Sequence, residues 1–350
     1  MLKARWIPYQ LMFRQPAGTS RGLLHTKSSW FLLVADTVQP QRVGIGEVSV
    51  IPGLSRDNIS GIENALDEVC AIINQTTLVR ENFDSDFPSI VFAFETALLD
   101  LKSGGERLLY KNSFTSGTSG IPINGLVWMG NFEEMKMRMT QKIDEGFRVI
   151  KIKVGAIDFT QELELLAYVR RHFSPDILTL RLDANGAFRP DQAFERLQQL
   201  SAFDIHSIEQ PVAAGQAEVM AELCEKSPIP IALDEELIAN FNMLEKKQLL
   251  EQIKPQYIIL KPSLIGGFNA ADAWINLAEK LKIGWWATSA LESNIGLNAI
   301  AQWTAQKSAS LPQGLGTGQL YTNNIPSPLE IRDAQLFYNP TKTWTLNPII

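Results

Sequence analysis

Short runs of apolar and β-branched residues alternate with longer amphipathic segments from residue 121 onward. Five of these runs end in a charged residue, at Lys153, Asp183, Glu209, Asp234 and Lys261, so the steps between the charges are 30, 26, 25 and 27 residues. Each step is the length of one strand plus one helix. A buried parallel strand reads as a continuous apolar run, and a charge at its tip is typical of a site at the carboxyl end of the strand.

The amphipathic segments between the strands have helical spacing. We predict helices over residues 133–145, 160–173, 190–202, 216–226, 241–252, 267–282 and 295–306, with strands between them that include 121–129, 284–288 and 314–317. Counting gives seven βα units and a closing strand. The pattern therefore predicts an α/β fold, a (β/α)7β TIM-like barrel, with an open doubly wound sheet as the alternative.

The N-terminal third follows a different pattern. Strands are expected at 2–13, 30–36 and 42–50, and helices at 56–76 and 89–101. The stretch 14–28, rich in Gly, Ser and Arg, is expected to be a mobile loop between the first two strands. These elements predict a separate α+β unit.

The length of 350 residues exceeds that of a usual single core, and a barrel of about 250 residues with a smaller companion fits it. We therefore predict an α+β capping domain (1–105), a polar linker (106–120), a barrel domain (121–326) and a C-terminal segment (327–350) that returns to the capping domain and completes it.

The composition indicates an ordinary globular protein, with 45% hydrophobic and 20% charged residues. A net charge of −6 without a basic stripe argues against a nucleic-acid partner, and no apolar run is long enough for a membrane span. The N-terminus lacks the pattern of a signal peptide, and Cys70 and Cys224 are expected to be unpaired, so we expect a cytoplasmic location. The oligomeric state stays open.

Three of the charges at the strand tips are carboxylates: Asp183, Glu209 and Asp234. Three ionised side chains in one cavity repel each other strongly unless a cation lies among them. Oxygen ligands without Cys or His favour Mg²⁺, for which Mn²⁺ can substitute. The alternative is that each carboxylate is the N-cap of the helix that follows it.

Two lysines, Lys151 and Lys153, lie two residues apart on one predicted strand and therefore point to the same side of it. Inward-facing lysines need anionic partners. Nearby positive charge and a bound cation would lower the pKa of a lysine, so that its neutral amine acts as a base. Lys261 would reach in from the opposite wall. In the alternative, Lys151 and Lys153 face solvent.

Hydroxyl-rich and glycine-rich segments follow the last two strands, at 288–293 and 314–318. Hydroxyls and bare backbone N–H groups suit an anion, although ordinary turn chemistry is the alternative. The candidates for contact with a small-molecule carboxylate substrate are Ser289, Ser293, Gly316 and Thr317.

The charged motifs occur together in the order and spacing of a known family. They are Lys-Ile-Lys at 151–153, Asp-Ala-Asn at 183–185, Glu-Gln-Pro at 209–211, Asp-Glu at 234–235 and Leu-Lys-Pro at 260–262. As a set they resemble the enolase superfamily and, within it, the muconate-lactonising branch, over nearly the whole chain. The resemblance implies a Mg²⁺-dependent enzyme that removes a proton α to a carboxylate. It also implies that Asn185 and Glu235 support the metal ligands.

Within the branch, Ser-Ala-Leu-Glu-Ser-Asn-Ile-Gly at 289–296 and Gly-Leu-Gly-Thr-Gly at 314–318 resemble the dehydratases of menaquinone biosynthesis. The resemblance implies a hydro-lyase in which Lys153 is the base, Lys151 stabilises the developing charge and Lys261 is a cation–π partner. Dipeptide epimerases usually carry Asp-x-Asp where this chain has Gly-Thr-Gly. Two alternatives remain: an N-acylamino acid racemase or related epimerase that uses both lysines across one carbon, and a non-catalytic barrel that binds a carboxylate.

Overall fold

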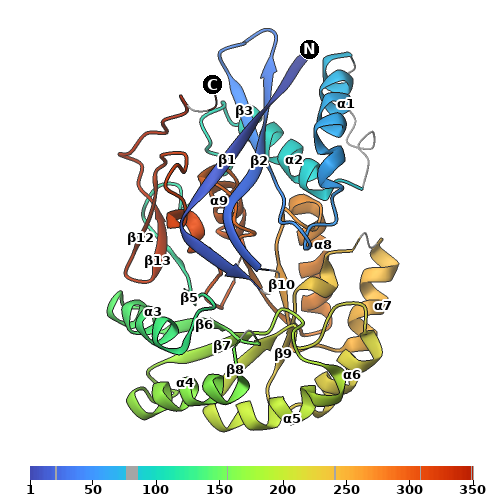
Figure 1. The fold of residues 1–350 in the computed structure, drawn as a ribbon. Helices are drawn as coiled ribbons and strands as arrows, with labels where there is room; N and C mark the ends of the chain where they lie inside the picture. Colours follow the sequence, from blue (N-terminus) through green and yellow to red (C-terminus); the bar gives the residue numbers. More distant parts are fainter. Residues whose placement is uncertain are drawn as a thin grey trace.

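A computed structural model describes residues 1–19, 22–75, 86–155, 157–239, 242–307, 309–347 and 349. It has an α/β fold built around a curled parallel sheet, with a smaller antiparallel sheet and two helices from the N-terminal part lying over one end (Figure 1). Within these residues, no helix is long and apolar enough to cross a membrane.

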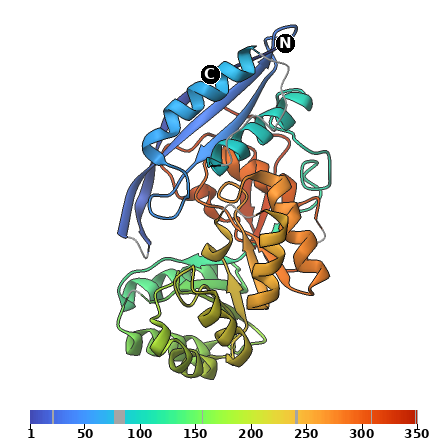
Figure 2. The same cartoon turned by 90° about the vertical axis from the view of Figure 1, so that its right-hand side faces the viewer.

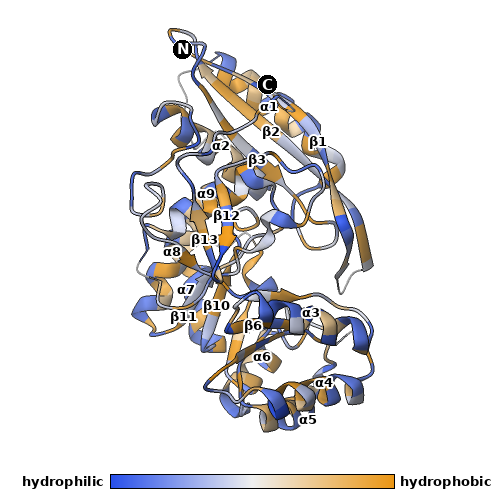
Figure 3. Ribbon diagram, turned by 90° about the vertical axis from the view of Figure 1, so that its left-hand side faces the viewer, coloured by the Kyte–Doolittle hydropathy of each residue, from blue (hydrophilic) through white to orange (hydrophobic). Residues whose placement is uncertain are grey.

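The N-terminal sheet consists of β1 (Leu2–Thr19), β2 (Gly22–Asp36) and β3 (Val43–Ser49), with β2 in the centre. From Ser29 to Val34 both faces of β2 are buried. Leu32 and its alternate neighbours pack against α1 (Ile62–Gln75) and α2 (Pro88–Lys102), while Phe31 and Leu33 face the opposite side. Figure 3 shows the hydrophobic stretches along β1 and β2. A short 3₁₀ turn, η1 (Ile59–Gly61), precedes α1, and Pro88 occupies the first turn of α2, which suits a residue without a backbone N–H.

The prediction of a mobile loop over 14–28 is wrong for the described part of that segment. β1 and β2 pair from Leu2↔Asp36 to Thr19↔Gly22, with one register shift between Met12 and Ala17, and residues 20 and 21 lie outside the described residues. The strand persists because a distant segment binds it: the Arg14 N–H donates to the Leu320 carbonyl at 2.8 Å. The resulting long hairpin extends toward the curled sheet (Figure 2).

The curled sheet has seven parallel strands in the order β11-β10-β9-β8-β7-β6-β5. Their bounds are β5 (Gly125–Val127), β6 (Val149–Lys153), β7 (Thr179–Asp183), β8 (Ile205–Glu209), β9 (Ile231–Leu233), β10 (Tyr257–Leu260) and β11 (Gly284–Ala287). The helices that follow them are α3 (Phe132–Asp144), α4 (Phe159–His172), α5 (Pro190–Leu200), α6 (Ala217–Lys226), α7 (Met243–Ile253), α8 (Gly267–Lys280) and α9 (Asn294–Thr304). The predicted alternation of strands and helices is confirmed to within a few residues, although the predicted ends at 76 and 241 lie outside the described residues. Short 3₁₀ turns add η3 (Ser201–Phe203), η4 (Glu235–Leu237) and η5 (Thr317–Gln319).

A short segment at 313–314 bridges the two edges of the curled sheet. The Gly314 N–H donates to the Ala287 carbonyl and the Gln313 N–H to the Pro122 carbonyl, each at 2.8 Å. Isolated parallel bridges pair Thr288 with Gly314 and Ile123 with Gln313. The strand predicted over 314–317 is therefore reduced to these bridges and the turn η5.

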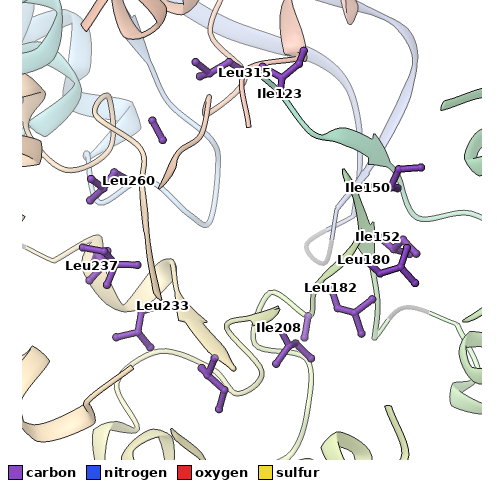
Figure 4. Packing of buried hydrophobic residues seen from close by; sticks show 14 of the residues in the cluster. Ile123, Ile150, Ile152, Leu180, Leu182, Ile208, Leu233, Leu237, Leu260 and Leu315 are labelled. Atoms are coloured by element: carbon purple, nitrogen blue, oxygen red, sulfur yellow. The ribbon is translucent and has the colours of Figure 1, made fainter. Parts of the chain in front are cut away.

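Alternate residues of the curled strands form the main hydrophobic core against the helices. Figure 4 shows side chains of this cluster arranged in a ring, among them Ile150, Ile152, Leu180, Leu182, Ile208, Leu233 and Leu260. Because side chains alternate along a strand, the residues between these positions face the interior of the curl. On β6, β7 and β8 the other face carries polar and charged groups, whereas on β9, β10 and β11 it also carries a small apolar cluster of Ala232, Ile259 and Trp286.

The C-terminal strands pair differently from the expectation. β12 (Leu329–Arg332) and β13 (Gln335–Tyr338) form a small sheet with β4 (Ile121–Pro122), so they do not join the N-terminal sheet. Beyond them the chain does reach that sheet, where Trp344, Leu346 and Ile349 pack in one cluster with Phe31 and Leu33. Hydrogen bonding of β13 to β4 anchors the strands, and apolar burial anchors the tail.

Close packing of β3 on α2 depends on a bare backbone. A Cβ added to Gly46 would lie 1.7 Å from the Ala93 carbonyl oxygen. We predict that Gly46→Ala lowers the free energy of unfolding by about 2–3 kcal/mol, because helix and strand must separate. Urea unfolding would measure the loss. Gly61→Ala is the control, since its added methyl meets the flexible Asn58 side chain and lies in ordinary contact with the Phe87 ring. Equal stability of the two variants would contradict this packing.

Candidate active site

The inward face of the curled sheet carries charge at the carboxyl ends of its strands. The strand register pairs Lys153 with Asp183 and Asp183 with Glu209, so three neighbouring strands present these groups at one level. Asp234 directly follows β9 and Lys261 directly follows β10. The five charges singled out from the sequence therefore lie on five neighbouring strands.

Ammonium and carboxylate groups alternate in this layer. Lys151 Nζ lies 2.7 Å from Asp183 Oδ2 and 2.5 Å from Glu209 Oε2, and Lys153 Nζ lies 2.5 Å from Asp183 Oδ2. Lys261 pairs in the same way with Asp234. The three lysine side chains are only 8%, 13% and 9% exposed, so the alternative of solvent-facing lysines is wrong for Lys151 and Lys153.

Two further polar residues join the layer. Lys153 Nζ donates to Asn185 Oδ1 at 2.6 Å, and Asn185 Nδ2 donates to Glu235 Oε1 at 3.0 Å. Asn185 has a positive φ of 45°, a conformation that Asn tolerates better than most residues. The amide therefore links the amine of Lys153 to the carboxylate of Glu235.

The carboxylates do not cap the helices that follow them. The N-cap residues of α5, α6 and α7 are Arg189, Gln216 and Asn242. Asp234 does precede the short turn η4, but its side chain makes no capping hydrogen bond. The helix-capping alternative is therefore wrong for these three helices.

The charge environment keeps two lysines protonated. Burial favours the neutral amine of Lys151, but the Asp183 and Glu209 carboxylates outweigh it and raise the pKa of Lys151 above its ordinary value. Burial likewise opposes the charge of Lys261, and Asp234 raises its pKa. The lowered lysine pKa expected from the sequence assumes a cation bound among the carboxylates, and it stays a prediction.

The pKa values of two neighbouring carboxylates shift in opposite directions. Burial opposes ionisation of Asp183, yet Lys151 and Lys153 hold the pKa of Asp183 well below its usual range. For Glu209, burial and the neighbouring Asp183 raise the pKa well above its usual range, against the pull of Lys151. Like charges on paired strands therefore make Glu209 harder to ionise than Asp183.

The predicted cage of three carboxylates is not preassembled. Across the described ranges, no three Asp, Glu, His or Cys side chains gather closely enough to form a ready-made metal site. Each carboxylate pairs with a lysine instead, because the positive ammonium groups offset the repulsion between the carboxylates. Nevertheless, the donors fit a hard cation: Glu209 Oε1 and Asp234 Oδ1 are buried carboxylate oxygens without a hydrogen-bond partner.

A pocket of about 380 Å³ opens onto the charged layer. From the curled sheet and its loops, it is lined among others by Lys151, Lys153, Lys261, Asn185, Ser289, Gly316 and Thr317. Ser293 does not line it, contrary to the prediction. Ser293 is the N-cap of α9, where its hydroxyl accepts from the Ile295 N–H at 3.2 Å.

The N-terminal part supplies a wall of the same pocket, a role that the sequence leaves open for residues 14–28. Phe13 to Ala17 of the hairpin line it, together with Ile51 and Leu54 after β3. Local sequence signals favoured a loop in the hairpin, and no periodicity in β1 indicates which distant segment it covers. The local signal that the hairpin covers another part of the molecule is the set of apolar residues beside its Gly-rich stretch.

Comparison with known proteins places the chain in a family. Residues 134–340 match the enolase C-terminal domain-like family, and the chain belongs to it. The chain is 46% identical to an o-succinylbenzoate synthase from Desulfotalea psychrophila, over 92% of this chain and 95% of that protein.

Two further proteins are similar to this chain over most of its length. The crystal structure of MenC from Desulfotalea psychrophila matches with a TM-score of 0.86 at 43% identity, covering 96% of this chain and 99% of that one. An L-Ala-D/L-Glu epimerase from Bacillus subtilis is 23% identical, over 84% of this chain and 81% of that protein. The epimerase is a more distant relation than the synthase.

Another ionisable group of this part of the chain is the half-buried His206 in β8. Its ring stacks on Tyr257 with centroids 5.1 Å apart, and the nearby guanidinium of Arg181 lies 4.0 Å over the Trp286 ring. Burial and the charge of Arg181 lower the pKa of His206 to about 4. His206 is therefore neutral in the folded protein at neutral pH.

We predict that this histidine makes stability fall in mild acid. Because the unfolded chain binds the proton with an ordinary pKa of about 6.5, the free energy of unfolding decreases as pH falls from about 6.5 toward 4. His206→Gln should flatten this part of the profile, as measured by urea unfolding at several pH values. The exposed His172→Gln is the control; equal profiles for both variants would contradict the assignment.

Proposed function

We propose that the chain is an o-succinylbenzoate synthase. This hydro-lyase would remove water from 2-succinyl-6-hydroxy-2,4-cyclohexadiene-1-carboxylate to form o-succinylbenzoate in menaquinone biosynthesis. The observation that carries the proposal is that Lys151, Lys153 and Lys261 line one pocket beside buried carboxylates. The identity of 46% to the Desulfotalea synthase supports the choice of reaction.

We also propose that the curled sheet is a (β/α)7β barrel, which the bridges through 313–314 support. In this view residues 1–105 form the capping domain, 106–120 the linker and 121–326 the barrel. The segment 327–350 then completes the cap through its tail. A cytoplasmic location is part of the proposal, supported by the free, buried thiols of Cys70 and Cys224.

Asp183, Glu209 and Asp234 are the proposed ligands of Mg²⁺, with Mn²⁺ as a substitute. The two unpartnered oxygens, on Glu209 and Asp234, support this donor set. When bound, the metal supplies Lewis-acid stabilisation of charge on the substrate carboxylate. It would also take over the compensation of carboxylate charge that the lysines now provide, which leaves the amine of Lys153 available for the substrate.

The lysines carry the proposed proton transfers. Lys153 removes the proton α to the substrate carboxylate, and Lys151 stabilises the negative charge that develops there. The C–H electron pair becomes a ring double bond as the C–O bond breaks, and the proton on Lys153 leaves with the hydroxyl group as water. Lys261 stacks over the ring as a cation–π partner. Asn185 orients Lys153 through its hydrogen bond, and Glu235 holds Asn185.

An N-acylamino acid racemase or related epimerase is the second candidate. It is favoured by the presence of both Lys153 and Lys261 on the pocket wall, since such enzymes use a base on each side of one carbon. The Gly-Thr-Gly at 316–318 argues against a dipeptide epimerase. Incubation with N-acyl amino acids in D₂O separates the candidates, because exchange at the α-carbon reports racemase chemistry.

We predict that Lys153→Ala lowers turnover by at least about 10²–10⁴-fold, since a positioned base supplies that factor. The assay follows aromatisation of the cyclohexadiene precursor by absorbance, with added Mg²⁺. Circular dichroism checks that the fold is retained. Lys226→Ala is the control, because Lys226 pairs with Glu222 on the exposed face of α6. Full activity of Lys153→Ala would remove the base assignment, and an inactive parent enzyme would remove the proposed reaction.

A further inference from the structure

A second set of buried charges lies where the N-terminal sheet meets the loop that leads into α9. Its members are Lys27 on β2, Glu47 on β3 and Glu292 in the loop before α9, at 3%, 0% and 0% exposure. None of the three lines the pocket, and the proposed mechanism uses none of them. Buried charges are costly unless they are paired and hydrogen-bonded, so their partners need an explanation.

Glu47 holds the start of α9 from the neighbouring sheet. Its Oε1 accepts from the Ser293 backbone N–H at 2.9 Å, and its Oε2 accepts from the Ser293 hydroxyl at 2.6 Å and the Gly296 N–H at 3.0 Å. A carboxylate at this position accepts hydrogen bonds from N–H groups that have no partner within the helix. It also interacts favourably with the positive end of the helix dipole. The fit is close: a Cβ on Gly296 would lie 3.0 Å from Glu47 Oε2.

Lys27 supplies the counter-charge through two hydroxyls. Its Nζ donates to Ser49 Oγ at 2.7 Å and to Ser29 Oγ at 3.1 Å, and Ser29 in turn donates to Glu47 Oε1 at 2.9 Å. All of these residues lie on β2 and β3, which pair in register. The N-terminal sheet therefore presents a preformed, charge-compensated carboxylate to α9, which packs against β3.

The segment held in this way is part of the pocket wall. Ser289, Ala290 and Leu291 line the pocket, and only Glu292 separates them from the Ser293 cap. Glu292 tightens the turn, because it accepts from the Ser289 hydroxyl at 2.5 Å and from the Ala290 N–H at 2.8 Å. Thr317, also on the pocket wall, donates to Ser289 at 2.7 Å.

The backbone of this turn is strained. Leu291 has a φ of 63°, a conformation that a branched side chain rarely adopts. Its carbonyl accepts from the Tyr321 hydroxyl at 2.7 Å. Strained residues in binding walls persist only when their surroundings over-determine them. Here the constraint comes from two sides, from Tyr321 and from the capped helix that follows.

We propose that Glu47 is a positioning residue: by capping α9 from the N-terminal sheet, it sets the place of the 289–291 wall against the substrate. Lys27 holds that carboxylate in place through the Ser29 hydroxyl. The N-terminal sheet thus acts on the pocket by a charged contact as well as through the hairpin that covers it. The kinetic part of this inference rests on the proposed function, whereas the structural part does not.

Hydrogen exchange of the unliganded protein tests the structural part. Glu47→Gln, which keeps the shape and removes the charge, should speed exchange of the Ser293 and Gly296 amides by at least about tenfold, because both donate to this carboxylate and their acceptor is weakened. Asp57→Asn is the matched control: Asp57 is a buried carboxylate of the same N-terminal part that binds Ser89 instead. It should leave exchange in 290–297 unchanged. Unchanged exchange in Glu47→Gln would overturn the inference, whether or not the protein is a synthase.

Kinetics test the positioning role at a temperature well below the melting point of each variant. We expect Glu47→Gln to lower kcat/KM for the cyclohexadiene carboxylate by at least about tenfold, and Asp57→Asn to leave it unchanged even if its melting temperature falls. Ser293→Ala, which retains the backbone contact, should give an intermediate loss and serves if Glu47→Gln does not fold. Lower stability of Glu47→Gln and Ser293→Ala with unaltered kcat and KM would reduce Glu47 to a structural contact. An inactive parent enzyme would instead refute the proposed function and leave the exchange result to decide.

Discussion

The alternation of ammonium and carboxylate groups at the carboxyl ends of β6 to β10 is the interaction on which the rest of the site depends. Three acidic side chains on neighbouring strands would repel each other, and three lysines buried among apolar walls would lose their hydration. Interleaved, each set compensates the other, as the shared contacts of Lys151 with Asp183 and Glu209 demonstrate. Removing one member leaves an uncompensated buried charge, which costs several kcal/mol.

Strand register is what makes this interleaving possible. Lys153, Asp183 and Glu209 pair directly across β6, β7 and β8, so the backbone hydrogen bonds of the sheet set their spacing before any side chain adjusts. The apolar residues between them are buried against the helices and prevent a slip of register, since a slip by one residue would turn every charge into the core. The geometry of the site is therefore a consequence of the core.

The remaining parts of the pocket come from outside the curled sheet. The charged layer suits proton transfer and cation binding, but it offers little that recognises the shape of a substrate. The hairpin residues Phe13 to Ala17 and the capped turn at 289–291 supply that surface. Their positions depend on contacts between segments that are distant in the chain, and Glu47 reaches Ser293 across 246 residues of sequence.

This division explains what could be predicted from the sequence. The strands and helices of the curled sheet, and the charges at the strand tips, follow from apolar runs and spacing, which are local signals. The strands within 14–28 could not be predicted, because Arg14 is held by a carbonyl near residue 320. Ser293 is predicted to line the pocket, but it caps α9. The sequence does not show whether a hydroxyl in a loop contacts a ligand or caps a helix. The raised pKa of Lys151 depends on which charged groups lie nearest to it, and the pairing of strands that are distant in the sequence decides this.

Crystals grown with Mn²⁺ offer the most direct measurement, because anomalous scattering locates the ion without reference to activity. We expect one strong peak within ligand distance of Asp183, Glu209 and Asp234, with the amine of Lys153 released from Asp183. A peak elsewhere, or saturating Mn²⁺ with all three lysines still paired to the carboxylates, would contradict the account.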